Sequence, residues 1–307
     1  MIGGSTTGLK LHPWNEGFTW TEHAGPFRRL TSAQARQFDD EGYVLVTDAI
    51  DEATLAAVRA ECDRYDERTE AYLRGQADGR VMIAEAGAIT FSTHLVARSG
   101  VLRAFAADTV FAELGHDLVG PDVRLYWDQA VYKKPEKPRR FPWHQDNGYT
   151  FVEPQQYLTC WVPLTDATID NGCPHVVPGL HRLGTLHHEY VDPLGYECLS
   201  DPPGEVAVEA PAGSVVVFSS LTPHLTGPNV TTAVRKAYIL QYAPDGARAM
   251  RGDPTTGRPE RSEPCDEPQR QFPVLVNGDL AGPTAGERHE PANLTTAATS
   301  RRRGRRA

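Results

Sequence analysis

The spacing of apolar residues divides the chain into two parts with different periods. Up to about residue 118, apolar side chains recur every three or four positions, as in Leu55, Val58 and Cys62, which predicts amphipathic helices. We expect helices at 32–41, 101–107 and 111–118. A further helix is expected to begin directly after Asp51, which serves as its N-cap. The apolar run 43–46 between the first two helices predicts a short strand.

From about residue 122 the helical period gives way to short apolar runs separated by proline and glycine. These runs predict strands at 123–132, 157–163, 174–177, 206–209, 214–219 and 235–243. No helical segments alternate with them, so a parallel sheet built from strand–helix–strand units is excluded. The sequence therefore predicts a mainly β sandwich or barrel, flanked by the N-terminal helices.

Three segments have no regular pattern. Residues 1–30 are rich in Gly, Pro and Thr and predict an irregular arm that packs on the domain. The segment 182–205 is long, polar and without a regular period, which is typical of loops that act as lids. Residues 246–307 are rich in Pro, Gly, Thr, Arg and Glu, so we expect a largely disordered extension with a solvated basic tip at 301–306. The main domain is then expected to span 31–245.

Composition excludes several functional classes. Hydrophobic residues make up 40% of the 307 residues, enough for a sizeable core, and the net charge of −9 argues against nucleic acid as a partner. The five cysteines are odd in number and form no CxxC pair, which is typical of reduced thiols. With no apolar signal segment and no long apolar run, we expect a cytoplasmic protein without a membrane partner.

The candidate chemistry begins with His144 and Asp146, which are separated by one residue. On one strand such residues point to the same face, so both can reach one ion. His224, just beyond the apolar run 215–218, is the best candidate for a third ligand. Two imidazoles and one carboxylate leave three positions of an octahedron open, as in non-haem Fe(II) oxygenases. The His-x-Asp pair alone is weak evidence, because the chain has 11 histidines.

An arginine follows the third candidate ligand. Arg235 lies 235 − 224 = 11 residues after His224 and opens the predicted strand 235–243. A guanidinium there can hold a carboxylate with two parallel hydrogen bonds. The alternative is a surface charge at the start of a strand. Other histidines carry less weight: His181 is expected to cap a turn, and His187 and His188 to be solvated.

The motifs together resemble those of the phytanoyl-CoA dioxygenase (PhyH) family of Fe(II)/2-oxoglutarate oxygenases. The resemblance extends from about residue 28 to 245. It is carried by the segments KP at 134–135, FPWHQDN at 141–147, WVPLTD at 161–166, DNGC at 170–173, VPGLH at 177–181, PHLTGPN at 223–229 and RKA at 235–237.

The resemblance implies a double-stranded β-helix, the cupin-type jelly roll. It implies Fe(II), 2-oxoglutarate and O₂ as cofactor and co-substrates, with His144, Asp146 and His224 as the metal ligands. It also implies that Arg235 binds the distal carboxylate of 2-oxoglutarate, with Thr226, Trp161 and Gln129 as further contacts. The expected activity is hydroxylation of a small organic molecule with release of succinate and CO₂. The arginine-rich composition is typical of GC-rich bacteria, and because members of this family in such bacteria often modify secondary metabolites, the resemblance favours a substrate of that kind.

Several alternatives remain open at this stage. The same oxidising chemistry can give desaturation, epoxidation or cyclisation. Related halogenases carry a small residue at the position of Asp146, so the carboxylate argues against halogenation. A non-catalytic cupin-like binding protein is disfavoured by the intact set of three ligands together with Arg235. A zinc hydrolase would use the same three ligands but gives no obvious role to Arg235 and Thr226. The sequence specifies neither the substrate nor the oligomeric state.

Overall fold

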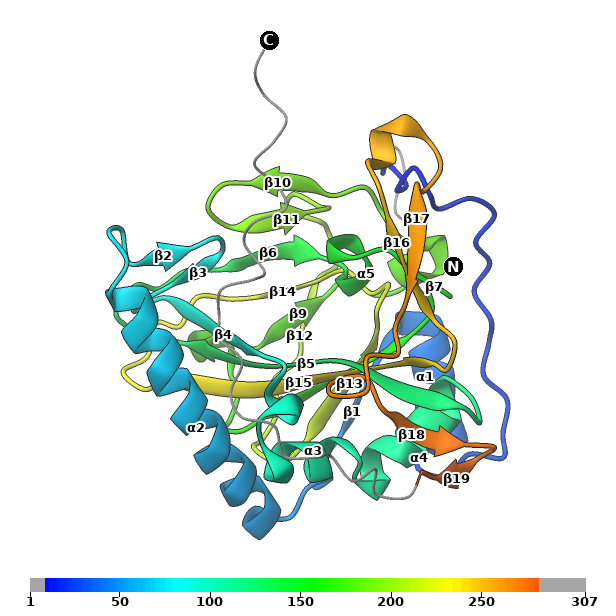
Figure 1. Cartoon of the computed structure of the whole chain (residues 1–307), viewed down its shortest axis with the longest axis horizontal. Helices are drawn as coiled ribbons and strands as arrows, with labels where there is room; N and C mark the ends of the chain where they lie inside the picture. Colours follow the sequence, from blue (N-terminus) through cyan, green and yellow to red (C-terminus); the bar gives the residue numbers. More distant parts are fainter. Residues whose placement is uncertain (1–8, 282–307) are drawn as a thin grey trace.

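Two antiparallel β-sheets face each other in the computed structural model, which describes residues 9–281. Helices α2, α3 and α4 lie beneath the larger sheet, and the smaller sheet lies on its other side (Figure 1). One apolar cluster, which includes Val131, Trp161, Val176 and Phe218, fills the space between the sheets. A second and larger cluster lies between the larger sheet and the helices. This arrangement is the predicted jelly roll with flanking helices.

The larger sheet contains the longest strands and is antiparallel throughout. Its order is β1 (Tyr43–Val46), β13 (Val215–Ser219), β8 (Leu158–Pro163), β15 (Arg235–Pro244), β5 (Val123–Lys133), β4 (Ile89–Thr93), β3 (Ala84–Glu85) and β2 (Arg80–Val81). Strand β18 (Pro273–Val276) pairs with β5, and β19 (Asp279–Leu280) pairs with β18.

The smaller sheet is formed by shorter strands in the order β12 (Val206–Ala207), β9 (Pro174–Val176), β14 (His224–Thr226) and β6 (Phe141–His144). Two small sheets lie outside this pair. One is the hairpin of β10 (Glu189–Val191) and β11 (Gly195–Glu197). The other contains β17 (Arg261–Pro264), β16 (Arg248–Arg251) and β7 (Val152–Glu153).

The helices begin at the capping residues that the sequence indicates. Thr31 and Gln34 form a reciprocal capping box at the start of α1, and Asp51 caps α2. The α-helices are α1 (Ser32–Glu41), α2 (Glu52–Arg74), α3 (Gly100–Ala106), α4 (Thr109–Leu118) and α5 (Asp146–Tyr149). Short 3₁₀ turns are η1 (Leu95–Ala97), η2 (Ile169–Asn171), η3 (Leu180–Leu183) and η4 (Pro254–Thr256). The observed bounds of α1 agree with the prediction.

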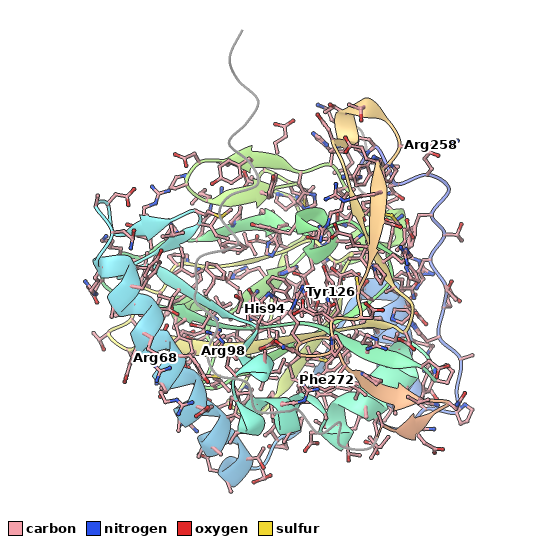
Figure 2. The ribbon with its side chains drawn as sticks, viewed as in Figure 1. Arg68, His94, Arg98, Tyr126, Arg258 and Phe272 are labelled. Atoms are coloured by element: carbon pink, nitrogen blue, oxygen red, sulfur yellow. The ribbon has the colours of Figure 1, made fainter. Side chains whose placement is uncertain are left out.

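Regular structure continues past residue 245, where we expected a largely disordered extension. Four strands lie between residues 248 and 280, and β18 extends the larger sheet by pairing with β5. Phe272, labelled in Figure 2, is buried with Val274 and Leu275 in the cluster beneath that sheet. These strands have two to four residues, too few to show a period, and β16 and β18 also pair with the distant strands β7 and β5. The basic tip at 301–306 lies outside the described residues.

The other two irregular segments can be compared with their predictions. The arm at 9–30 forms no helix or named strand; it is joined to the domain by a bridge between Leu11 and Leu186 and by the buried ring of Trp20. The segment 182–205 includes the β10–β11 hairpin, so it has regular structure that its sequence did not indicate. No helix among residues 9–281 is long and apolar enough to cross a bilayer.

Candidate metal centre

The three predicted ligands converge on one point between the sheets. Strands β6 and β14 pair so that His144 lies opposite His224, with their ring centres 4.1 Å apart. One ligand atom from each of His144, Asp146 and His224 lies within 4.8 Å of the others. One feature differs from prediction: β6 ends at His144, and Asp146 begins α5. Gln145 between them is still extended, with φ −109° and ψ 143°, so both neighbours reach the same side.

Both imidazoles are oriented by the backbone. Nδ1 of His144 lies 2.9 Å from the carbonyl oxygen of Pro142, and Nδ1 of His224 lies 3.0 Å from that of Thr222. A carbonyl can only accept, so each Nδ1 carries the proton. Each Nε2 is then unprotonated and free to bind a cation. A hydrogen-bond acceptor for the ring nitrogen that does not bind the metal is the usual way in which proteins orient metal-binding histidines.

The carboxylate of Asp146 lies between the two imidazoles. Its Oδ1 is 3.9 Å from Nε2 of His144 and 3.9 Å from Nε2 of His224. Its Oδ2 accepts a hydrogen bond of 2.5 Å from Oγ1 of Thr159. Burial raises the pKa of Asp146, while the neighbouring His144 and the Thr159 hydrogen bond oppose that rise. A cation bound here would remove the cost of burying this carboxylate.

Burial also keeps both imidazoles neutral. It lowers the pKa of His144 to about 3 and the pKa of His224 to about 4, and the second imidazole adds to the effect at His144. Neutral imidazole is the form that binds a metal ion. The site therefore presents two neutral nitrogens beside the carboxyl group of Asp146, which is the donor set of a mononuclear Fe(II) centre.

Arg235 lies in the same cavity with an unsatisfied charge. It begins β15 opposite Lys133 on β5 and is 1% exposed. Within residues 9–281, none of its three guanidinium nitrogens has a hydrogen-bond partner. Burial lowers its pKa to about 9, so it remains charged at pH 7. A buried cation without a partner is costly, and the guanidinium is therefore suited to an anionic ligand.

All seven predicted site residues line this cavity. Besides the three candidate ligands and Arg235, the lining includes Thr226 on β14, Trp161 on β8 and Gln129 on β5. Thr159 also lines it but was not predicted. It lies two residues before Trp161 on the same strand, so the alternation of strand side chains places both on one face. That alternation could have identified Thr159 from the sequence.

An aromatic wall, also not predicted, lies beside the ligands. The ring of Tyr149 on α5 meets His144 edge to face at 5.3 Å and stacks on Phe141 at 6.2 Å. Tyr196 on β11 meets Tyr149 at 5.4 Å, and Tyr190 on β10 meets Tyr196 at 5.5 Å. These rings connect the candidate metal centre to the β10–β11 hairpin. Nothing in the period of the sequence indicates the connection, because it depends on how that hairpin folds back.

A family model and several known proteins are similar to this chain in sequence. The family model described as Phytanoyl-CoA dioxygenase (PhyH) matches residues 38–237, more than half of the chain. An ectoine dioxygenase from Bordetella bronchiseptica is 25% identical over 234 residues, covering 69% of this chain and 75% of the relative.

Two crystal structures are similar as a whole. EctD from S. alaskensis with 2-oxoglutarate and 5-hydroxyectoine has 25% identity and a TM-score of 0.58, covering 83% of this chain and 91% of that one. The non-heme alpha ketoglutarate dependent carbocyclase SnoK from nogalamycin biosynthesis has 21% identity and a TM-score of 0.64, covering 82% of this chain and 100% of that one. This similarity supports the fold. With the family model matched across most of the jelly roll, the chain belongs to the phytanoyl-CoA dioxygenase (PhyH) family.

Proposed function

We propose that His144, Asp146 and His224 hold Fe(II) in this 2-oxoglutarate-dependent dioxygenase. The observation that carries the proposal is the combination of these three converging side chains with the unpartnered guanidinium of Arg235 in one cavity. A zinc hydrolase or a simple binding protein would need the first feature but not the second. An oxygenase of this class needs both.

The chain's residues provide the positions that the reaction requires. Iron and 2-oxoglutarate, when bound, would activate O₂: one oxygen atom would enter succinate as CO₂ is released, and the other would be added to the substrate. The three protein ligands leave other metal positions open. Arg235 pairs with the distal carboxylate of 2-oxoglutarate, and Trp161 provides a flat wall beneath that guanidinium. Thr226 and Gln129 are the further polar contacts that line the cavity.

The substrate is proposed to be a small organic molecule whose reacting part is apolar and uncharged. The cavity walls near the ligands include Phe91, Val131, Phe141 and Ile239. The charged side chains of the adjoining segments are already paired with one another: Arg140 with Glu197, Arg139 with Glu85, and Arg80 with Asp192. Apart from Arg235, which we assign to 2-oxoglutarate, and the metal ligands, the described lining of the cavity has no charged side chain, which favours a neutral group at the metal.

Hydroxylation is the outcome that we propose, with a secondary metabolite as the favoured substrate. The similar proteins named above include an ectoine dioxygenase and an EctD structure that contains 5-hydroxyectoine, which favour hydroxylation, and a carbocyclase from nogalamycin biosynthesis. The five unpaired cysteines are in keeping with a reducing cytoplasm, where we place the enzyme.

The test is a coupled assay on the full chain. The protein with Fe(II), 2-oxoglutarate and O₂ is incubated with a panel of neutral and charged small metabolites, and succinate is measured beside the mass of each metabolite. We expect succinate to form in step with a mass gain of one oxygen atom in a neutral compound. The variant His144→Ala is expected to form no succinate. Succinate formation at the same rate in both proteins would refute the proposed site. Loss of hydrogen without oxygen gain would replace hydroxylation by desaturation or cyclisation.

A further inference from the structure

The backbone between the first two candidate ligands is held by a histidine from a distant segment. The amide N–H of Gln145 donates to Nε2 of His188 at 2.9 Å. Nδ1 of His188 lies 2.9 Å from the carbonyl oxygen of Leu186, which can only accept, so Nδ1 carries the proton. This pattern leaves Nε2 as the acceptor. His188 was expected to be solvated, but it is 8% exposed and both of its ring nitrogens are used.

The Gln145 side chain is bound to the same distant segment. Gln145 is completely buried, and its Nε2 donates to the carbonyl oxygens of Gly184 and Leu221 at 3.0 and 2.6 Å. Its Oε1 accepts from the amide of Leu186 at 2.6 Å. Both the backbone and the side chain of the residue between His144 and Asp146 are therefore fixed by residues 184–188. That segment is in turn held by the N-terminal arm, through Lys10 and His12.

A glycine provides the space that this histidine occupies. A Cβ atom added to Gly148 would lie 2.1 to 2.4 Å from three atoms of the His188 ring. Such a distance is far inside van der Waals contact, so any larger residue at 148 would displace the ring. Gly148 follows Asp146 within α5, and the imidazole thus packs directly against the turn that carries the carboxylate ligand.

From these contacts we infer that His188 is a positioning residue for the metal centre. It holds the 145 peptide so that His144 and Asp146 present their ligand atoms to one ion. The inference rests on the proposed role of those two residues as ligands. The first part of the segment expected to be a lid, residues 184–188, therefore acts as a support of the centre. Removing an outer partner of this kind typically weakens metal binding by about 10- to 100-fold.

The experiment measures metal affinity directly and needs no substrate. The full chain, freed of metal, is titrated with Co(II) by calorimetry, beside His144→Ala as the variant that lacks a ligand. We expect His188→Leu to weaken Co(II) binding by roughly 10- to 100-fold. His188→Gln, whose side-chain oxygen can accept from the 145 amide, should recover most of the affinity. His188→Leu that binds Co(II) as tightly as the wild type would overturn the inference.

A matched control separates positioning from general stability. His23 also uses both ring nitrogens, toward Asp39 Oδ1 at 2.7 Å and the carbonyl oxygen of Leu118 at 3.0 Å, but it contacts neither ligand segment. His23→Leu should lower the melting temperature and leave the Co(II) affinity unchanged. If both leucine variants lose Co(II) affinity equally, the effect is general and the inference is refuted.

A second route covers the case in which His188→Leu does not fold. Gly148→Ala suits a helix and adds only the Cβ that displaces the ring. It should weaken Co(II) binding in the same way, and adding His188→Ala to it should cause no further loss, because the two changes remove the same contact. Additive losses would overturn the inference. A wild-type chain that binds no Co(II), or binds it no better than His144→Ala, would instead refute the proposed function.

Discussion

The guanidinium carbon of Arg235 lies 5.1 Å from the centre of the Trp161 ring, and both residues line the cavity that contains the three candidate metal ligands. The two residues come from neighbouring strands of the larger sheet, β15 and β8. The ring faces the cation without satisfying its hydrogen-bonding groups, since an aromatic face offers attraction but no lone pair. The pair therefore leaves the guanidinium available to a carboxylate.

Replacing Arg235 by glutamine should raise the KM for 2-oxoglutarate. Loss of a buried, hydrogen-bonded charge pair costs on the order of 2–5 kcal/mol, equivalent to at least a roughly thirtyfold rise. The measurement is the rate of succinate formation as a function of 2-oxoglutarate concentration. Arg124→Gln is the control, because Arg124 pairs with Asp245 at 2.8 Å away from the cavity. An unchanged KM in Arg235→Gln would remove Arg235 from the co-substrate site.

Thr159→Val should weaken metal binding while changing the shape of the side chain little. Thr159 donates to Oδ2 of Asp146, and a hydrogen bond to a charged group contributes about 1.5–3 kcal/mol, or at least roughly tenfold in affinity. Co(II) titration measures the change, with Asp146→Ala as the more severe variant. Thr90→Val is matched to it, because Thr90 is also buried and donates to an aspartate, Asp66, far from the ligands. Equal Co(II) affinities in Thr159→Val and the wild type would contradict this role.

The sequence predicts the centre better than its surroundings. The sequence points to His144, Asp146, His224 and Arg235 through local motifs: a His-x-Asp pair, a histidine after the apolar run 215–218 and an arginine at the start of a long strand. The structure brings all four residues into one cavity. The helix 32–41 could be predicted for a similar reason, since Thr31 and Gln34 form a local capping box. These features depend on residues that are a few positions apart in the chain, so they can be recognised in a single sequence.

The parts that could not be predicted depend on contacts between distant segments. The hydrogen bond from Gln145 to His188 spans 43 residues, and the bridge between Leu11 and Leu186 joins the arm to the same segment. The strands after 245 are similar, because β18 is stabilised by pairing with β5, about 150 positions earlier in the chain. Their own residues, rich in proline and charge, indicate a loop.

The variant Phe272→Ala measures how much the region after residue 245 contributes to the stability of the folded protein. Phe272 is 3% exposed, and the guanidinium carbon of Arg103 on α3 lies 4.0 Å from its ring centre. Truncating a buried phenylalanine costs about 3–5 kcal/mol, so the urea midpoint should fall clearly. Leu280→Ala is the control, because Leu280 is 53% exposed and should change the free energy of unfolding little. Equal stability in the two variants would mean that this region contributes little to the core.

His181 should make the stability of the protein depend on pH. Its ring is fully buried and packs edge to face against Trp20 at 4.4 Å, and Nε2 lies 3.1 Å from the carbonyl oxygen of Asp39. Burial lowers its pKa from 6.5 to about 4. As the pH falls below 6.5, the unfolded chain takes up a proton that the folded chain does not bind until about pH 4. The free energy of unfolding therefore falls with pH across that window.

Replacing His181 by leucine removes this contribution. From a folded pKa of about 4, the wild type should lose roughly 2 kcal/mol more than His181→Leu between pH 7 and pH 5. Urea unfolding of both proteins at the two pH values measures the difference, and the comparison cancels the other histidines that the two chains share. If the two free energies of unfolding fall in parallel, His181 takes up a proton equally in the folded and unfolded chains, and its burial does not oppose the charge.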